Sequence, residues 1–493
     1  MTSIPKDYTL NETIHPWLHA INLSFVPGPM TPVLEEVIDG MRQEFERLGH
    51  NIQETPDDST DVVLTTAPFG VPLSWRDALI FKIRRLYNLS RTPTFYTLVQ
   101  VSPDELQRQL DLFQTVIEKD APDPADFDFP GLAADAHRVL YEQGRRGGPI
   151  LALERLVQAY SKSIHVLLLV ADESPVEMYH FDLVGANPRT RADDMDAFYV
   201  DIVLRMVTSM STIEVKEHEL VGDPVPNELW KHLSTPDAMA VAGQQIGERS
   251  FFTDMVHISD VVDVPKVTDT IAEQYSEGCF ATWDPQINAL ISTVTGSARP
   301  VDKGNITEDD LAVIVGVRED GMGAQVRHVD GKRNDPPSTE AVELIDLDSL
   351  LPEVDLGPEW EIEARVPVVR SKLHGHRGIK AYDPTCVEYV TLDPPYYDYP
   401  VSCATSAQAQ GIKSAFSRSE ALLNPEDPRP IVFTVLPGHG TVIAEKWVPG
   451  KEPFQQMWEY MDSGQLQVDN MVPQGSMTYI PGSDDKMILK AEE

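Results

Sequence analysis

The sequence predicts an α/β protein with two doubly wound parallel-sheet domains, followed by a C-terminal, mostly antiparallel β domain of barrel-like form. Strand and helix patterns alternate along the first part of the chain, which is typical of a parallel sheet with right-handed crossovers. Near residue 285 proline and glycine become frequent, and short β-like runs replace the alternation. The 493 residues also exceed what one ordinary core accommodates. We therefore expect domains at residues 1–125, 126–285 and 286–493.

The first domain is expected to contain three strands, each leading to a helix. The helix over 31–50 begins with a threonine cap and a proline in its first turn, the usual signals of a helix start. The remaining expected elements are strands at 18–28, 61–70 and 93–101 and helices at 75–89 and 103–119.

The second domain is expected to follow a linker rich in proline and aspartate at 120–131. Helices are predicted over 132–148 and 150–162, then the apolar strand 164-IHVLLLVA-171. A polar loop over 179–194 and a long helix to about residue 210 complete the pattern. In the third domain short strands are expected at 312–317, 324–329, 366–369, 387–392, 430–436 and 441–448.

Composition narrows the class of protein. The formal net charge of −38 repels nucleic acid and anionic membrane surfaces, so neither is an expected partner. No run of about 18 or more apolar residues occurs, and the N-terminal residues lack the pattern of a secretory signal, so we expect a cytoplasmic protein. Three cysteines without zinc-site spacing are expected to be reduced thiols. P-loop, GxGxxG, GxSxG and HExxH motifs are absent.

Two loops are expected beyond the carboxyl ends of parallel strands, where open α/β sheets bind ligands. The loop at 65–77 carries Trp75, and the loop at 180–193 carries Arg189. Both residues are candidates for substrate binding, although an ordered surface loop is an equal alternative. A further polar loop, 328-HVDGKRNDPPSTE-340, is consistent with no more than a decorated hairpin turn.

Carboxylates cluster around residues 277–304. Glu277 and Asp284 flank a small, aromatic-containing run, and Asp302 follows within 299-RPVDKGN-305. Such carboxylates can bind a metal ion or move a proton. The alternative is a carboxylate that caps or pairs at a domain edge.

The segment 370-RSKLHGHRGIK-380 concentrates basic residues in an acidic chain. His374 and His376 are two positions apart, so on a strand both side chains face the same side. Two imidazoles on one face are a usual start for a divalent-metal site, and the flanking cations Arg370, Lys372 and Arg377 suit an anionic or hydroxylated substrate. A structural histidine pair is the alternative.

A third glycine-framed histidine, His439 in 436-LPGHGTV-442, follows an apolar strand of the same domain. Its flanking glycines leave it unshielded, which suits a ligand or a general base. Lys446, on the next strand, is expected to reach the same pocket.

The succession of two α/β blocks, the EGCFATWDP turn and a C-terminal β domain resembles the L-fucose and L-arabinose isomerase superfamily. That resemblance implies aldose–ketose isomerisation with Mn²⁺ or a similar divalent ion, and a homo-oligomer. Glu277 looks like the first glutamate of that family, and His439 or His376 is similar to its late histidine. Asp302, beside Lys303, stands where the family places its second carboxylate.

The leading hypothesis is therefore a metal-dependent sugar isomerase acting on a small carbohydrate. Two alternatives stay open: a metal-free lyase or transferase acting on a phosphorylated or carboxylated substrate, and a non-catalytic sugar-binding or assembly protein. The predicted metal ligands are Glu277, His376 and His439, and the predicted catalytic residues are Glu277, Asp284 and Asp302. The predicted substrate-binding residues are His374, Arg370, Lys372, Arg377, Trp75 and Arg189.

Overall fold

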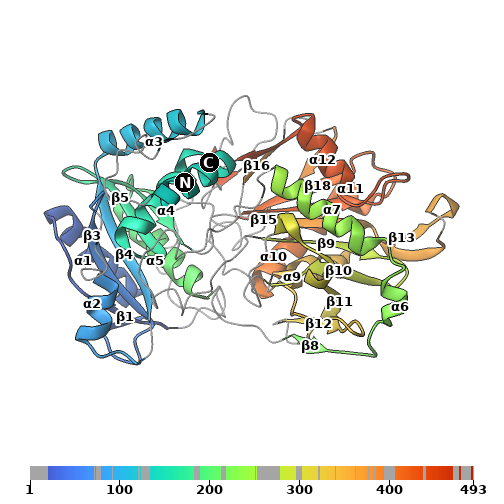
Figure 1. The fold of residues 1–493 in the computed structure, drawn as a ribbon, viewed down its shortest axis with the longest axis horizontal. Coiled ribbons are helices and arrows are strands. Elements are labelled where there is room, and N and C mark those ends of the chain that lie inside the picture. The colour runs from blue at the N-terminus through green and yellow to red at the C-terminus, as the bar shows by residue number, and fades with distance from the viewer. Residues whose placement is uncertain are drawn as a thin grey trace. The chain divides into compact units, whose positions relative to one another are not determined.

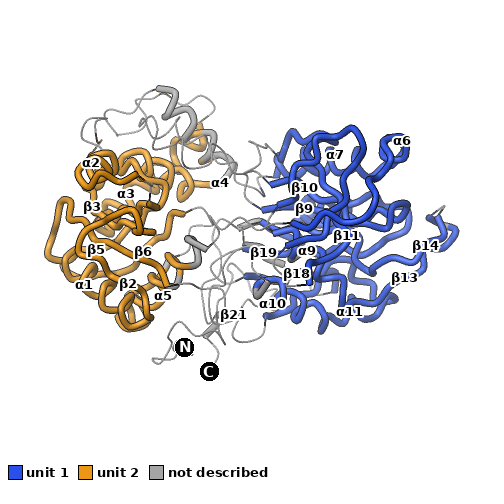
Figure 2. The backbone as a smooth tube through the Cα atoms, turned by 90° about the horizontal axis from the view of Figure 1, so that it is seen from below, with its two compact units in different colours: residues 1–2, 212–252, 275–493 blue, residues 3–211, 253–274 orange. Residues whose placement is uncertain are grey.

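The chain forms two compact units, shown in different colours in Figure 2. Unit 1 comprises residues 1–2, 212–252 and 275–493, and unit 2 comprises residues 3–211 and 253–274. This computed structural model describes residues 20–71, 73, 79–90, 93–119, 123, 134–182, 189–211, 218–249, 251, 278–295, 303–319, 323–338, 340–360, 362–375, 378–381, 385–392, 406–436, 440–469, 477–478 and 490–491.

Unit 2 is an α/β unit built on one sheet (Figure 1). Its elements are, in chain order, β1 (Asn22–Phe25), α1 (Pro32–Arg47), β2 (Asn51–Gln53), β3 (Val62–Pro68), α2 (Leu79–Leu86), β4 (Thr94–Val101), α3 (Pro103–Ile117), α4 (Ala134–Ser161), β5 (His165–Ala171), β6 (Pro175–Phe181), β7 (Arg189–Arg191) and α5 (Met195–Ser211).

The seven strands of this sheet lie in the order β2-β1-β3-β4-β5-β6-β7. β2, β1, β3, β4 and β5 are parallel, as expected of a doubly wound sheet, whereas β6 and β7 continue it in antiparallel fashion. β4 and β5, expected in two different domains, are neighbours here, so the expected boundary near residue 125 lies inside unit 2.

Local sequence signals determine several helix ends in unit 2. The side chain of Thr31 accepts a hydrogen bond from the N–H of Leu34, and Pro32 opens α1. Ser102 caps α3 in the same way, through the N–H of Glu105. The two helices expected over 132–162 are both present as α4, which is interrupted at Gly148, where φ is 80°.

Helices cover both faces of this sheet. On one face α1 packs through a ring contact between Phe45 and Phe25 of β1, and α1 also contacts α5. On the other face Ile80 and Ile83 of α2 pack against Phe95 of β4, and α3 packs on α4. The result is the three-layer arrangement that a parallel sheet needs in order to bury both faces.

Unit 1 is also an α/β unit, with a larger sheet (Figure 1). Its elements are, in chain order, β8 (Glu219–Leu220), α6 (Asn227–Trp230), α7 (Thr235–Glu248), β9 (Cys279–Asp284), β10 (Ala289–Thr293), η4 (Lys303–Asn305), η5 (Glu308–Asp310), β11 (Leu311–Val317), β12 (Ala324–Arg327), α9 (Ala341–Asp346), η6 (Leu347–Leu350), β13 (Glu353–Leu356), η7 (Pro358–Trp360), β14 (Ala364–Pro367), β15 (Val369–Gly375), β16 (Gly378–Ala381), β17 (Val387–Tyr389), α10 (Ser406–Phe416), α11 (Glu420–Leu423), β18 (Ile431–Leu436), β19 (Gly440–Lys446), α12 (Gln455–Asp462), β20 (Leu466–Asp469), β21 (Met477–Thr478) and β22 (Lys490–Ala491).

The main sheet of unit 1 has nine strands in the order β17-β18-β19-β15-β9-β10-β11-β12-β8. Most neighbours are antiparallel, as expected, and the two pairs at the edges, β17 with β18 and β12 with β8, are parallel. The pairs β13–β14, β16–β20 and β21–β22 form three further two-stranded sheets.

Two apolar clusters lie on opposite faces of this sheet. One packs alternate residues such as Phe280 and Leu373 against α7 and α12. The other packs the intervening residues, such as Ala281, against α9, α10 and α11. Unit 1 is therefore a sheet between two helical layers rather than a barrel-like β domain. The residues of the central strands β9, β10, β15 and β19 are buried, except for the partly buried Arg370.

Candidate functional site

Three central strands of unit 1 meet at one end of the sheet. β15 is antiparallel to both of its neighbours, so its last residues lie beside the first residues of β9 and β19. His374 pairs with Cys279 of β9, and Gly375 pairs with Thr441 of β19. We call this place, defined by Gly278, His374, Gly375 and Thr441, the β15 end.

Lys303 joins the same place from η4. It is buried, and its amine donates a hydrogen bond to the carbonyl oxygen of Gly278, the residue just before β9. The loop that brings Lys303 here packs on α7, where the carbonyl of Lys303 lies so close to Gly243 that any side chain at that glycine would clash with it. The position of Lys303 at the β15 end is therefore fixed by close packing.

Four residues predicted to form the site lie outside the described residues, but each is the sequence neighbour of a residue near the β15 end. These neighbours are Gly278 for Glu277, Lys303 for Asp302, Gly375 for His376 and Gly440 for His439. Gly440 itself pairs with Leu436 at the end of β18. The sheet register thus brings together the chain segments that lead into all four residues.

His374 and Glu340 meet at the β15 end. The imidazole Nδ1 lies 3.1 Å from the carbonyl oxygen of Thr441, a group that only accepts hydrogen bonds. Nε2 lies 3.1 Å from the Glu340 carboxyl. Both residues are buried. His374 therefore lies in the interior and positions the end of β15, whereas the sequence predicted direct contact with a substrate.

Lys372 and Arg370, the other described members of the predicted substrate wall, also face inward. Lys372 is 0% exposed, and its amine pairs with the carboxylate of Asp348 in η6. The guanidinium of Arg370 lies between the rings of Trp360 and Trp447, at 5.4 and 4.8 Å. These cations were expected to bind a substrate; in the structure helices cover both faces of the sheet and the two cations contact other residues of unit 1.

Burial shapes the charge state of this interior. It raises the pKa of Asp348 to about 6, against the opposing effect of Lys372, and lowers the pKa of Lys372. Glu445 of β19 is a buried carboxylate that the sequence did not single out. It accepts from the N–H groups of Phe454 and Met457 at the start of α12, and burial raises its pKa to about 7.

Asp284, predicted to be catalytic, ends β9 at the other side of the sheet. Its carboxylate accepts hydrogen bonds from the N–H groups of Gln286 and Ile287 and so shapes the turn between β9 and β10. The five steps along β9 from Cys279 span roughly 17 Å. This separation places Asp284 at the opposite end of β9 from the β15 end.

The two ligand loops predicted in unit 2 have different outcomes. The loop after β3 lies at the point where the strand order reverses between β1 and β3, and Thr66 donates to the carbonyl of Pro29 in the loop after β1. The loop expected over 180–193 is partly strand β6, which is antiparallel. Its His180 and Phe181 therefore lie near the amino end of β5, whereas Arg191 of β7 lies level with Val170, near the carboxyl end of β5.

Inside unit 2, Asp182 is buried and forms a bidentate ion pair with Arg205 of α5, in which each of the two contacts measures 2.9 Å. Arg189 belongs to β7 and pairs with Tyr179 through the backbone. Trp75 and Arg377 lie outside the described residues.

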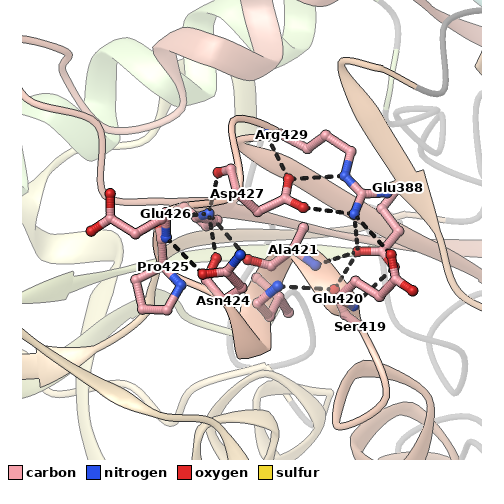
Figure 3. A network of polar contacts seen from close by, with 11 residues as sticks. Glu388, Ser419, Glu420, Ala421, Asn424, Pro425, Glu426, Asp427 and Arg429 are labelled. Atoms are coloured by element: carbon pink, nitrogen blue, oxygen red, sulfur yellow. Dashed lines mark hydrogen bonds and ion pairs between the residues drawn. The ribbon is translucent and has the colours of Figure 1, made fainter.

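Lys446 lies at the far end of β19 from Gly440 and does not share a pocket with the β15 end. Its amine donates to the carbonyl oxygens of Ala421, Asp427 and Pro425, at 3.1, 2.8 and 3.3 Å. Figure 3 shows the surrounding network, in which Glu388 accepts from Ser419 and from the first N–H groups of α11. Lys446 thus fastens the loop between α11 and β18.

Replacement of Lys446 with methionine is expected to lower the free energy of unfolding by about 2 kcal/mol, because several buried carbonyl oxygens lose their donor. Urea denaturation followed by circular dichroism measures this change. Lys231, whose ion pair with Glu228 is exposed, provides the control, and Lys231→Met is expected to cost at most about 1 kcal/mol. Equal effects of the two substitutions would contradict the role given to Lys446.

The fold and the β15 end define a two-unit α/β protein with mixed parallel and antiparallel sheets. Within the part of the chain that the structure describes, no helix is long and apolar enough to cross a membrane. The same described residues contain no group of three or more histidine, cysteine or acidic side chains arranged to hold a metal ion. No protein-family model, curated protein or solved structure matches the chain.

Proposed function

We propose that the protein is a metal-dependent enzyme that isomerises a small sugar between its aldose and ketose forms, with its site at the β15 end. One observation supports this proposal: the register of β9, β15 and β19 brings the neighbours of Glu277, Asp302, His376 and His439 to one end of one sheet. One or two carboxylates with two imidazoles form a donor set that suits Mn²⁺ and similar divalent ions.

In this proposal Glu277, His376 and His439 hold the ion, which supplies Lewis-acid polarisation of the sugar carbonyl and its neighbouring hydroxyl. Asp302 takes the proton from C2 of the aldose and returns it to C1. The proton of the C2 hydroxyl passes to the oxygen at C1, which gives the ketose. His374 and Glu340 act behind the site by fixing the end of β15. The corresponding cellular setting is a cytoplasmic homo-oligomer.

Metal content and isomerase activity test this proposal directly. Purified protein is expected to bind a divalent ion and to form ketose from aldopentoses or 6-deoxyaldohexoses when Mn²⁺ is added. Glu277→Gln and His439→Gln are expected to weaken metal affinity by more than the roughly 10–100-fold caused by loss of an outer-shell partner. Exposed residues of unit 1 supply matched controls, Glu319→Gln and His232→Gln. Absence of a bound ion together with unchanged turnover on adding Mn²⁺ would refute the proposal.

The contact between the His374 imidazole and the Glu340 carboxyl, 3.1 Å apart, favours a second candidate, a metal-free lyase or transferase with acid–base catalysis. In that case His376→Ala and Glu340→Gln abolish turnover of a phosphorylated or carboxylated substrate, and chelators leave turnover unchanged. A non-catalytic sugar-binding protein would instead show stabilisation by sugars without any turnover.

A further inference from the structure

A pocket of about 390 Å³ lies at the β8 edge of the large sheet of unit 1, where β9 and β10 separate β11 from β15. β11, β12 and β8 form one side of it, and the turn over 328–337 forms the other. Its volume is within the range of small-molecule sites, which are largely apolar with a few convergent polar groups. The apolar lining includes Leu220, Leu311, Val326 and Pro337.

The strand side of the pocket is held by backbone pairing. The N–H of Val221 donates to the carbonyl of Val326 at 2.9 Å, and the N–H of Val225 donates to that of His328 at 2.8 Å. The segment before β8 is fixed as well, because Nδ1 of His218 accepts from the N–H of Ala324 at 3.0 Å. This pocket wall is therefore preorganised rather than a loose surface fold.

The turn side is equally constrained. Asn334 has a φ of 57°, and its side chain accepts from the N–H of Val329 and donates to the carbonyls of Val329 and Lys332, at 2.7, 3.0 and 2.9 Å. Further along, the carbonyl of Pro336 accepts from the N–H of Thr295 at 2.9 Å. The polar turn at 328–337 is thus a rigid wall of the pocket.

The polar groups of the pocket favour an anion. Arg327, His328 and His218 line it, whereas its carboxylate, Asp335, is already paired with Arg333 at 3.0 Å. Within the described part of the chain, Nε of Arg327 donates to the carbonyl of Asp223 at 3.0 Å, and no carboxylate lies within ion-pair distance of this guanidinium. A cation without an acidic partner is notable in a chain of net charge −38.

We propose that this pocket binds a small organic anion, a carboxylate or a phosphate monoester, whose charged group contacts Arg327 and whose apolar body lies against Leu220, Leu311 and Val326. Carboxylate and phosphate share the planar or forked acceptor geometry that a guanidinium recognises. The site is separate from the proposed isomerase site, so its occupancy does not depend on metal or on turnover.

Isothermal titration calorimetry of the full chain with benzoate, phenyl phosphate, inorganic phosphate and the neutral benzyl alcohol tests this proposal. Benzoate or phenyl phosphate is expected to bind at least about 10-fold more tightly than benzyl alcohol, as a charge-assisted contact predicts. Whichever of benzoate and phenyl phosphate binds more tightly shows whether the pocket prefers a carboxylate or a phosphate. Phenyl phosphate is expected to bind more tightly than inorganic phosphate, because only its phenyl ring contacts the apolar wall of the pocket.

Two variants and one control complete the test. Arg327→Gln is expected to weaken binding of the preferred anion by about 10–100-fold without changing the binding of benzyl alcohol. Leu220→Trp fills the pocket from β8, where Leu220 is 57% exposed and the fold tolerates a larger side chain, and is expected to abolish binding. Arg365→Gln, on the exposed pair with Glu353, should bind as the parent does. No binding by the parent, or parental affinity in either pocket variant, overturns the proposal.

Discussion

Replacement of Lys372 with methionine is expected to lower the free energy of unfolding by about 3–5 kcal/mol, the usual effect of removing one partner from a buried ion pair. Lys372 is 0% exposed and the side chain of its partner Asp348 is 8% exposed, so the remaining carboxylate cannot recover its hydration. Urea denaturation at pH 7, followed by circular dichroism, measures the change. An effect below about 1 kcal/mol, the level of an exposed pair, would show that the pair does not hold η6 on the sheet.

The pH dependence of the Lys372→Met variant provides an independent check. Burial already raises the pKa of Asp348 to about 6, and Lys372 opposes that rise. Without the lysine the carboxyl should stay protonated to higher pH in the folded state. A folded-state pKa above the unfolded value favours the folded state at low pH, so the variant should regain stability as the pH falls and lose it as the pH rises. The double variant Lys372→Met, Asp348→Leu should recover about 1–4 kcal/mol.

Acidification from pH 7 to pH 5 is expected to destabilise unit 2 by about 2 kcal/mol for each of three buried histidines. Burial lowers the pKa of His50 and His165 to about 4 and that of His180 to about 3; Asp182 and Arg205 act on the last two with opposite signs. The unfolded chain takes up protons below its pKa of about 6.5, whereas the folded unit stays neutral. Stability is therefore full above pH 6.5 and is lost as the pH falls.

Native-state hydrogen exchange, corrected for the intrinsic pH dependence of exchange, separates this effect by unit. In the double variant His165→Leu, His180→Leu, the opening free energy of β5 and β6 should fall less steeply as the pH is lowered. The exposed control His232→Gln should leave this pH dependence unchanged. Unit 1 should respond in the opposite direction, because the pKa of Glu445 is raised to about 7 and its burial favours the folded state at lower pH. The same acid slope in parent and double variant would contradict the assignment.

Much of unit 2 was predictable because its signals are local. The caps at Thr31 and Ser102, the continuous apolar run of β5 and the break at Gly148 each appear in a few consecutive residues. β6 was missed because its polar residues, such as His180, suggest a loop. His180 is buried and contacts Thr190 of β7, and no local pattern reveals such a tertiary partner.

In unit 1 the strands were predictable but the layers were not. The helices α9, α10 and α12 are short, and α10 is rich in small and polar residues, so their sequences lack a clear apolar period. Without them a barrel-like β domain was expected instead of a sheet between helical layers. The burial of Lys372 and the contacts of Arg370 with Trp360 and Trp447 were therefore not foreseen.

In the candidate site, too, local features were visible in the sequence and long-range contacts were not. The glycines beside the histidines lie at the ends of strands, Gly375 at the end of β15 and Gly440 at the start of β19. The roles of Glu340 and Lys303 were not visible, because they reach the β15 end from segments more than 30 residues before His374 in the sequence. The distance of Asp284 from the β15 end was not visible either, because it depends on the extended conformation of β9.

The strand order of unit 1 also constrains when this sheet can form as the chain is synthesised. β19 lies between β15 and β18, near the middle of the sheet, yet it is among the last strands in sequence. Until residue 446 has left the ribosome, β15 has an unpaired edge, whereas the strands of unit 2 are complete by residue 191. Unit 2 is thus able to fold first, and unit 1 spends a long interval with exposed strand edges, a period in which chaperones protect such chains from aggregation.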